Sequence, residues 1–199
     1  MTLPLLTAIS NGNLDQVKAL WQAPGPRDTS FCSRAASGGH LHILQFLRAQ
    51  EPPCPWNERT CENAAKNGHL HVLQWLRAQD PPCPWDEHAC IMAAMDGHLH
   101  ILQWLRAQVP PCPWNNYPGS DVFQALPYVH DERYPWEKFT RNWFISANKR
   151  YKVFRWLQKS EKVELEPNVL RWMAEVDESV KQVSTSSDLQ NLVKQFVEM

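Results

Sequence analysis

Three segments of the chain carry the same helical pattern of apolar and polar positions. In residues 70–77, leucines recur every three residues, and Val72 and Trp75 widen the apolar stripe. Apolar positions at this spacing fall on one side of an α-helix. The pattern returns at residues 41–48 and 99–106, so the sequence predicts three equivalent amphipathic helices.

A second predicted helix precedes each of these and carries small apolar residues. In one copy, Asn57 is a suitable N-cap, and Cys61, Ala64 and Ala65 follow at positions i, i+3 and i+4 of a helix. Gly68 then predicts the end of this helix, because glycine readily adopts the left-handed conformation that closes a helix. Each copy therefore consists of a helix, a short turn and a second helix.

The two helices and the connector after them repeat every 29 residues. Cys-Pro-Trp begins at positions 54, 83 and 112, and Gly-His-Leu begins at positions 39, 68 and 97. A Pro-Pro pair before each Cys-Pro-Trp predicts an extended connector, because proline cannot continue a helix. One such helix pair cannot bury its apolar side alone, so copies are expected to stack into a solenoid. The best copies are residues 28–56, 57–85 and 86–114.

Weaker copies flank these three. The sequence predicts degenerate units at residues 4–27, 115–135 and 136–160, so that the array spans residues 1–160. Residues 161–199 contain two further amphipathic helical patterns, which we interpret as a C-terminal helical cap over the end of the array. The alternative is a partner-binding amphipathic hairpin.

The run Ala-Ala-Lys-Asn-Gly-His-Leu at residues 64–70 resembles the corresponding part of ankyrin repeats. The Cys-Pro-Trp variant resembles the shortened ankyrin-like arrays of protists, algae and giant viruses. This resemblance implies an all-α, ankyrin-like helix-turn-helix solenoid whose first helices line a concave groove. Two departures stand out. The unit is shorter than the ankyrin period of about 33 residues, and Arg-Thr-Cys-Glu at residues 59–62 replaces the usual Thr-Pro-Leu-His.

The three good copies differ mainly in their first helices. Four positions of that helix vary from copy to copy, whereas the second helices are nearly identical. The variable positions lie opposite the Cys-Ala-Ala face, so we expect them to point away from the core and to bind a protein partner. The alternative is that Ile91 and Met92 pack between adjacent first helices. The predicted binding residues are Arg59, Glu62, Asn63, Lys66, His88, Ile91, Met92 and Met95.

Six cysteines and paired histidines raise the hypothesis of a metal site, for example Cys54 and Cys61 with His69 and His71. The spacing differs from that of zinc sites, and on a helix the two histidines would point about 200° apart. We therefore predict no metal or cofactor, and cysteines that act as small buried apolar residues. The repeated histidine is expected to open the second helix and bond neighbouring backbone, the alternative being a pH switch.

Composition excludes further classes. Apolar residues make up 43% and charged residues 21% of the chain, as in globular proteins, and the net charge is −1. No run approaches the ~18 apolar residues of a membrane helix. The N-terminus lacks a signal-peptide pattern, which predicts a cytoplasmic protein, with the nucleus as alternative, and reduced cysteines rather than disulfides. Since no catalytic motif is present, we predict a protein that is not an enzyme.

One stretch departs from this charge balance. Residues 133–159 contain eight basic residues and one glutamate, interleaved with aromatic residues. We expect Lys149, Arg150 and Lys152 to be exposed and to form a secondary basic patch for an acidic protein surface. One alternative function is a nucleic-acid-associated protein that uses this stretch. Another is a structural subunit permanently embedded in a larger assembly.

Overall fold

The computed structural model describes residues 2–22, 27–113 and 141–160, together with residues 170, 171, 173, 174 and 177. In the helix at 141–160, side chains are described from residue 151 onward. The chain divides into two compact units, Met1–Asn115 and Asn116–Met199. The first unit contains the good repeats and the N-terminal degenerate one.

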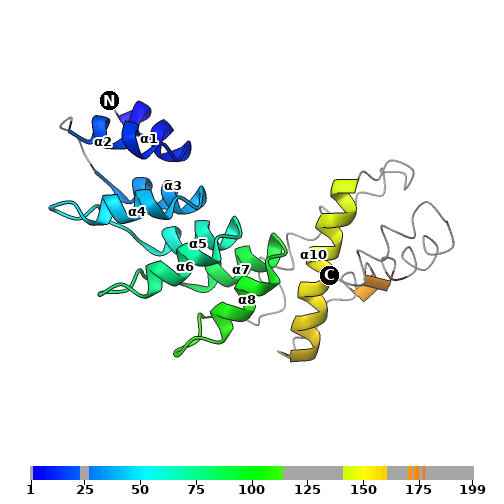
Figure 1. Ribbon diagram of the computed structural model, residues 1–199. Helices are drawn as coiled ribbons and strands as arrows, with labels where there is room; N and C mark the ends of the chain where they lie inside the picture. The colour runs from blue at the N-terminus through cyan, green and yellow to red at the C-terminus, as the bar shows by residue number, and fades with distance from the viewer. Residues whose placement is uncertain are drawn as a thin grey trace. The chain divides into compact units, whose positions relative to one another are not determined.

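The first unit is built from helix pairs that stack side by side (Figure 1). The first helices of successive pairs pack against one another, α1 on α3, α3 on α5 and α5 on α7, and the second helices follow alongside. This is the all-α helix-turn-helix solenoid that the sequence predicts. The pairs are α1 (Thr2–Ser10) with α2 (Leu14–Trp21), α3 (Thr29–Ser37) with α4 (Leu41–Arg48), α5 (Glu58–Lys66) with α6 (Leu70–Arg77), and α7 (Glu87–Met95) with α8 (Leu99–Arg106).

The helix boundaries follow from local hydrogen bonding. The Asp28 and Asp86 carboxylates each accept a bond from the backbone N–H two residues on, at 2.8 and 3.1 Å, and so cap α3 and α7. At α5, the N–H of Asn57 donates to the buried Thr60 hydroxyl at 3.4 Å. Gly68 has a φ of +83°, which confirms that glycine ends the first helix.

The core combines small residues on first helices with bulky residues on second helices. On α6, Val72, Leu73 and Leu76 are fully buried, as is the Cys-Ala-Ala set of α5. Leu70 and Trp75, which the helical pattern placed in the same stripe, are half-buried. The predicted core face is thus confirmed, with its edges partly open to solvent.

The connectors that follow α4, α6 and α8 are each held by an arginine from the end of the preceding helix. Arg77 donates through Nη1 to the carbonyl oxygen of Cys83 at 2.6 Å, and its guanidinium carbon lies 3.9 Å from the ring centroid of Trp85. The Trp85 ring packs edge-on against Trp104 of α8, with 6.2 Å between centroids. The connector between α4 and α5 repeats this arrangement. The predicted tryptophan packing is confirmed in both connectors, whereas Trp114 lies outside the described residues.

Arg77→Ala is expected to lower the free energy of unfolding by roughly 1–3 kcal/mol, because it removes a charged hydrogen bond and a cation–π contact. Arg59→Ala is the matched control, since the Arg59 side chain is exposed on α5. Urea unfolding followed by circular dichroism measures both variants. Equal destabilisation by the two substitutions would contradict the assigned role of Arg77.

The second unit contains α10 (Arg141–Ser160), whose residues Val153, Phe154 and Leu157 are buried. Tyr151 donates its hydroxyl hydrogen to the Asp177 carboxylate at 2.6 Å. Arg155 forms an ion pair with the same carboxylate at 3.6 Å. Asp177 therefore lies against α10.

The C-terminal half departs from the sequence-based expectation. The predicted unit at residues 136–160 shows one continuous helix from 141 to 160 rather than a pair, and it is grouped with the second unit rather than with the repeats. The physical reason is that α10 contains neither glycine nor proline, so nothing interrupts it. The predicted unit at 115–135 lies outside the described residues. So does most of the predicted cap at 161–199, in which Met173 is buried.

Candidate partner-binding surface

The predicted binding residues of α5 and α7 lie on the side of the first helices away from the Cys-Ala-Ala core. Arg59 and Lys66 of α5 are exposed. The remaining residues of the set, with one exception, are half-buried. These are Glu62, Asn63, His88, Met92 and Met95. We refer to Arg59, Glu62, Asn63, Lys66, His88, Met92 and Met95 as the variable face.

The exception is Ile91, which is only 5% exposed. The expectation that it points away from the core is wrong. In the repeat it occupies the position of Ser33, whose hydroxyl lies 3.3 Å from the Thr60 hydroxyl of the neighbouring first helix. This position therefore belongs to the seam between adjacent first helices, where an isoleucine is buried. The burial of Ile91 agrees with the packing alternative, and Met92 is half-buried.

Asparagine side chains form hydrogen bonds within α5 and from the end of α5 to α3. Asn67 donates through Nδ2 to the Ser37 hydroxyl of α3 at 3.2 Å and to the Asn63 carbonyl oxygen at 2.9 Å. Asn63 donates to the Arg59 carbonyl oxygen at 2.9 Å. These bonds fix the backbone that carries Arg59 and Lys66, whose side chains are exposed.

His88 adds a charge that depends on pH. Its Nδ1 lies 3.2 Å from an Asp86 carboxylate oxygen. Burial alone would lower the pKa of His88, but the Asp86 carboxylate, together with Glu62 and Glu87, outweighs burial and raises that pKa. The variable face thus presents Arg59, Lys66 and a histidine of raised pKa beside two methionines.

The second helices offer a contrast inside the same chain. Their exposed glutamines, Gln45, Gln74 and Gln103, are identical in the three good copies. Equivalent exposed or half-exposed positions of the first helices hold Arg34, Asn63 and Met92 instead. Packing does not require this variation, because these side chains are not in the core.

The structure describes only one side chain of the secondary basic patch, that of Lys152. Lys149 and Arg150 belong to α10, but their side chains lie outside the described residues. Lys152 is half-buried, not exposed as predicted. It lies next to the buried Val153 on the helix, which explains its partial cover.

Two rows of histidines tie each repeat to the one before it. His40, His69 and His98 each donate through Nε2 to a carbonyl oxygen of the preceding first helix, at 3.0, 3.1 and 3.0 Å. His42 and His71 bond in the same way to the carbonyl oxygens of preceding turn glycines, each at 3.2 Å. The predicted architectural role of the repeated histidine is confirmed.

The geometry of the paired histidines differs from expectation. The rings of His69 and His71 lie 6.0 Å apart, centroid to centroid, so the prediction that they point about 200° apart is wrong. The reason is that His69 is the N-cap of α6, with φ −92° and ψ 69°, and does not follow the helical spacing. Over the described part of the chain, no cluster of three or more His, Cys, Asp or Glu side chains could hold a metal ion.

His69 makes the stability of the array depend on pH. Partial burial lowers its pKa below the ordinary 6.5, against the opposing effect of its bond to Ser37, and the neighbouring His71 and His40 lower it further. Just below pH 6.5 the unfolded chain therefore binds more protons than the folded chain. The contribution of neutral His69 to the free energy of unfolding is thus complete above that pH and is lost on acidification. We expect the stability of His69→Gln to fall less than that of the parent between about pH 7.5 and 5.5.

Urea unfolding midpoints at the two pH values measure this effect. His100→Gln is the control, because His100 is exposed and occupies in its repeat the position of His42 and His71. A pH dependence of His69→Gln equal to that of the parent would contradict the assignment.

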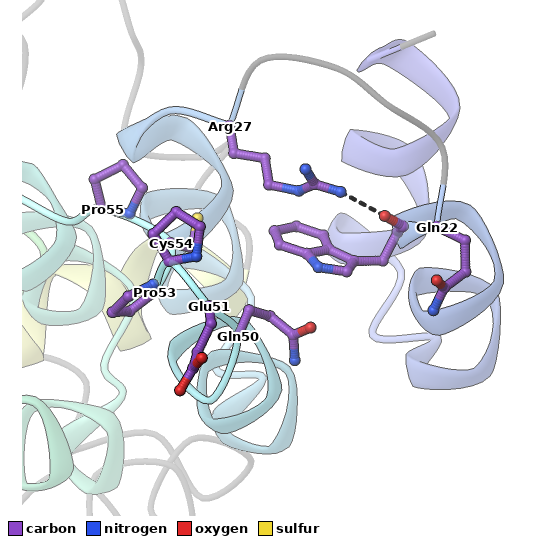
Figure 2. Close-up of a pocket in the computed structure, with 9 residues that line it drawn as sticks. Gln22, Arg27, Gln50, Glu51, Pro53, Cys54 and Pro55 are labelled. Carbon is purple, nitrogen blue, oxygen red and sulfur yellow. Dashed lines mark hydrogen bonds between the residues drawn. The ribbon is translucent and has the colours of Figure 1, made fainter.

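A pocket of about 530 Å³ opens between the first two repeats, at a place that the sequence patterns did not indicate (Figure 2). Arg27 extends across it from one side, and Gln50, Glu51 and Pro53 line the other. The Arg27 guanidinium carbon lies 4.0 Å from the Trp21 ring centroid. Arg27 stands 29 residues before Trp56, so an arginine occupies here the connector position that holds tryptophan in the next repeat. The cation–π pair is still formed, but the tryptophan now lies in the helix. The arginine at this position was the sequence signal that could have indicated the pair.

The fold agrees with a comparison against known families. The model of ankyrin repeats present in many copies matches residues 61–106, which run from α5 to the end of α8. No curated protein matches the chain. Among the described helices, none is long and apolar enough to cross a membrane. The matched segment contains the same helix pairs and connectors that recur upstream, and this part of the chain is ankyrin-repeat-like.

Proposed function

We propose that this chain is a protein-binding module that holds its partner on the variable face. Ankyrin repeats generally mediate protein–protein interactions, and proteins of this family are typically non-enzymatic scaffolds. The observation that carries the proposal is the contrast between the two helix layers. Solvent-facing positions are identical on the second helices and different on the first, although neither set is needed for the core.

The chemistry of the variable face indicates the kind of surface it fits. Arg59 and Lys66 supply two exposed positive charges on α5, and Met92 and Met95 supply adaptable apolar area on the adjacent α7. Methionine contacts of this kind suit interfaces, and separated cations select acidic groups. The expected partner surface therefore carries carboxylates beside an exposed apolar side chain.

The rigid backbone favours this use. First helices pack directly against one another, and the bonds from Asn67 join α5 to α3. A preformed surface binds with a smaller loss of conformational entropy than a surface that must order on binding. The layer of first helices therefore provides a scaffold on which the variable side chains are presented.

Lys66→Glu is expected to weaken retention of the partner at least about tenfold, because it places a carboxylate where an acidic partner surface must lie. Lys18→Glu is the matched control, since Lys18 is also an exposed lysine but lies on the second helix α2. Proteins captured from an extract of the source cells by the parent and both variants are compared by quantitative mass spectrometry.

A specific partner is a protein lost with Lys66→Glu and kept with Lys18→Glu. Met92→Asp should lose the same protein, since it disturbs the apolar part of the face. Circular dichroism verifies that each variant remains folded. Equal capture by the parent and Lys66→Glu, or equal loss with both lysine variants, would contradict binding through the variable face.

A further inference from the structure

The six cysteines of the repeats form three equivalent pairs. Each pair joins a cysteine on a first helix to the cysteine of the following Cys-Pro-Trp, 22 residues later in the chain. All six cysteines are buried, and none of them is in a disulfide. The pairs are Cys32 with Cys54, Cys61 with Cys83, and Cys90 with Cys112.

Hydrogen bonds hold the two sulfurs of a pair side by side. In the first pair, Cys32 donates its S–H to the Cys54 carbonyl oxygen at 3.8 Å, and Cys54 donates to the Asp28 carbonyl oxygen at 3.7 Å. The two thiols also contact each other. Asp28 is the N-cap of the helix that carries Cys32, so both sulfurs lie over the first turn of α3.

The other repeats keep the same arrangement. Cys61 donates to the Cys83 carbonyl oxygen at 4.0 Å, and Cys83 donates to that of Asn57, the N-cap of α5, at 3.5 Å. In the third repeat, the Cys112 thiol donates to the carbonyl oxygen of the N-cap Asp86 at 3.3 Å. The bond from the connector cysteine to the N-cap carbonyl oxygen is present in all three repeats, so it is a property of the repeat and not of a single loop.

Burial keeps these thiols unreactive while the connectors are closed. Cys32 is 0% and Cys54 1% exposed. The hydrogen bond with Cys54 and burial raise the pKa of the Cys32 thiol, which disfavours its reactive thiolate. The same hydrogen bond lowers the pKa of the Cys54 thiol, so its protection rests on burial. Opening of a connector would admit a reagent, and local opening of a loop costs less free energy than global unfolding.

We propose that each cysteine pair is a site of reversible disulfide formation within one repeat, reached when its connector opens. With a diazene oxidant, the connector thiolate adds to one nitrogen of the N=N bond, and the other nitrogen takes up a proton. The second thiolate then attacks the sulfur of this adduct, so that the S–S bond forms and the S–N bond breaks. The departing hydrazine takes up a second proton, so that two thiols are oxidised and one diazene is reduced.

The cross-link would tie the connector of a repeat to the first helix of the same repeat. In the first two pairs the first-helix thiol already bonds to the carbonyl oxygen of its connector partner, so we expect the folded array to accommodate the bond with little rearrangement. The oxidised chain is therefore expected to keep its helical structure and to unfold at a higher temperature. Thiol-reducing agents should reverse both the bond and the change in Tm.

The test treats the folded full-length chain with diamide, blocks remaining thiols with N-ethylmaleimide, and measures intact mass and disulfide-linked peptides. The expected product has lost about 6 Da, two hydrogens for each of three bonds. The linked peptides should join the partners within each repeat only. The blocking of all six cysteines, pairing between repeats, or loss of the helical spectrum would overturn the proposal.

Two variants sharpen the result. In Cys32→Ala, Cys54 should be blocked by N-ethylmaleimide, and the other two pairs should be oxidised. A disulfide between Cys54 and another cysteine would contradict the proposed pairing. Arg48→Gln removes the bond from Arg48 to the Cys54 carbonyl oxygen. It should speed formation of the first pair several-fold relative to the second, whose connector is still held by Arg77. An unchanged ratio of the two rates would overturn connector opening as the route.

Discussion

Leu73→Ala is expected to lower the free energy of unfolding by ~2–5 kcal/mol. Leu73 is fully buried on α6, beneath the small residues of α5. Truncation removes three carbon atoms from contact and leaves a cavity that neighbouring repeats fill only in part. The effect should be large for one substitution, because each repeat depends on the packing of its neighbours.

Gln74→Ala is the matched control, since Gln74 follows Leu73 on the same helix and is exposed. Its effect should stay within about 0.5 kcal/mol. Guanidinium unfolding of the parent and both variants gives the comparison. If Leu73→Ala unfolds at the same denaturant concentration as the parent, α6 does not contribute its leucine face to the stack.

Gly68→Ala is expected to cost about 2–4 kcal/mol, from a strained backbone and a displaced histidine. The φ of Gly68 is +83°, a conformation that disfavours alanine. A Cβ atom there would lie 2.8 Å from Cε1 of His98, the ring that reaches back from the next repeat. Moving this ring would weaken its 3.0 Å bond to the Lys66 carbonyl oxygen.

The contribution of the histidine can be separated from that of the backbone. With His98→Ala already in place, Gly68→Ala should cost less than in the parent, and the difference is expected to be about 0.5–3 kcal/mol. Thermal and urea unfolding of the four proteins of the cycle provides the numbers. Strict additivity would show that the glycine and the histidine act independently.

The repeat architecture could be predicted because each helix pair carries all its local signals. Asn57 and Gly68 mark the two ends of one helix, and the leucines of α6 show a single buried face. These signals recur at a constant spacing, so an error in one copy is corrected by the other two. The core followed from periodicity alone.

Part of the candidate surface could not be predicted. Helical spacing distinguishes the buried face of a helix from its exposed face, but it does not show which residues lie at the border between them. Ile91 shares its position with Ser33 and Glu62, two polar residues that suggest solvent. Only the distance between neighbouring first helices shows that this position is the seam. Charge composition has a similar limit, because it assigned Lys152 to an exposed basic patch although this residue is half-buried.

Features that depend on local conformation, and not on the spacing of residues, also could not be predicted from the sequence. The close approach of His69 and His71 follows from the non-helical N-cap conformation of His69. The pairing of Arg27 with Trp21 requires two residues from different places in the repeat to exchange roles. In the C-terminal half, an echo of the second-helix pattern around Val153 suggested a helix pair, yet an uninterrupted helix carries the same pattern.

Site-specific photo-crosslinking tests the proposed function most directly. A benzophenone amino acid replaces Lys66 on the variable face or, in a second protein, Gln74 on the exposed side of α6. Both proteins are irradiated with the captured partner under identical conditions. Our account predicts a covalent complex from position 66 and little or none from position 74. Cross-linking from position 74 without cross-linking from position 66 would contradict it.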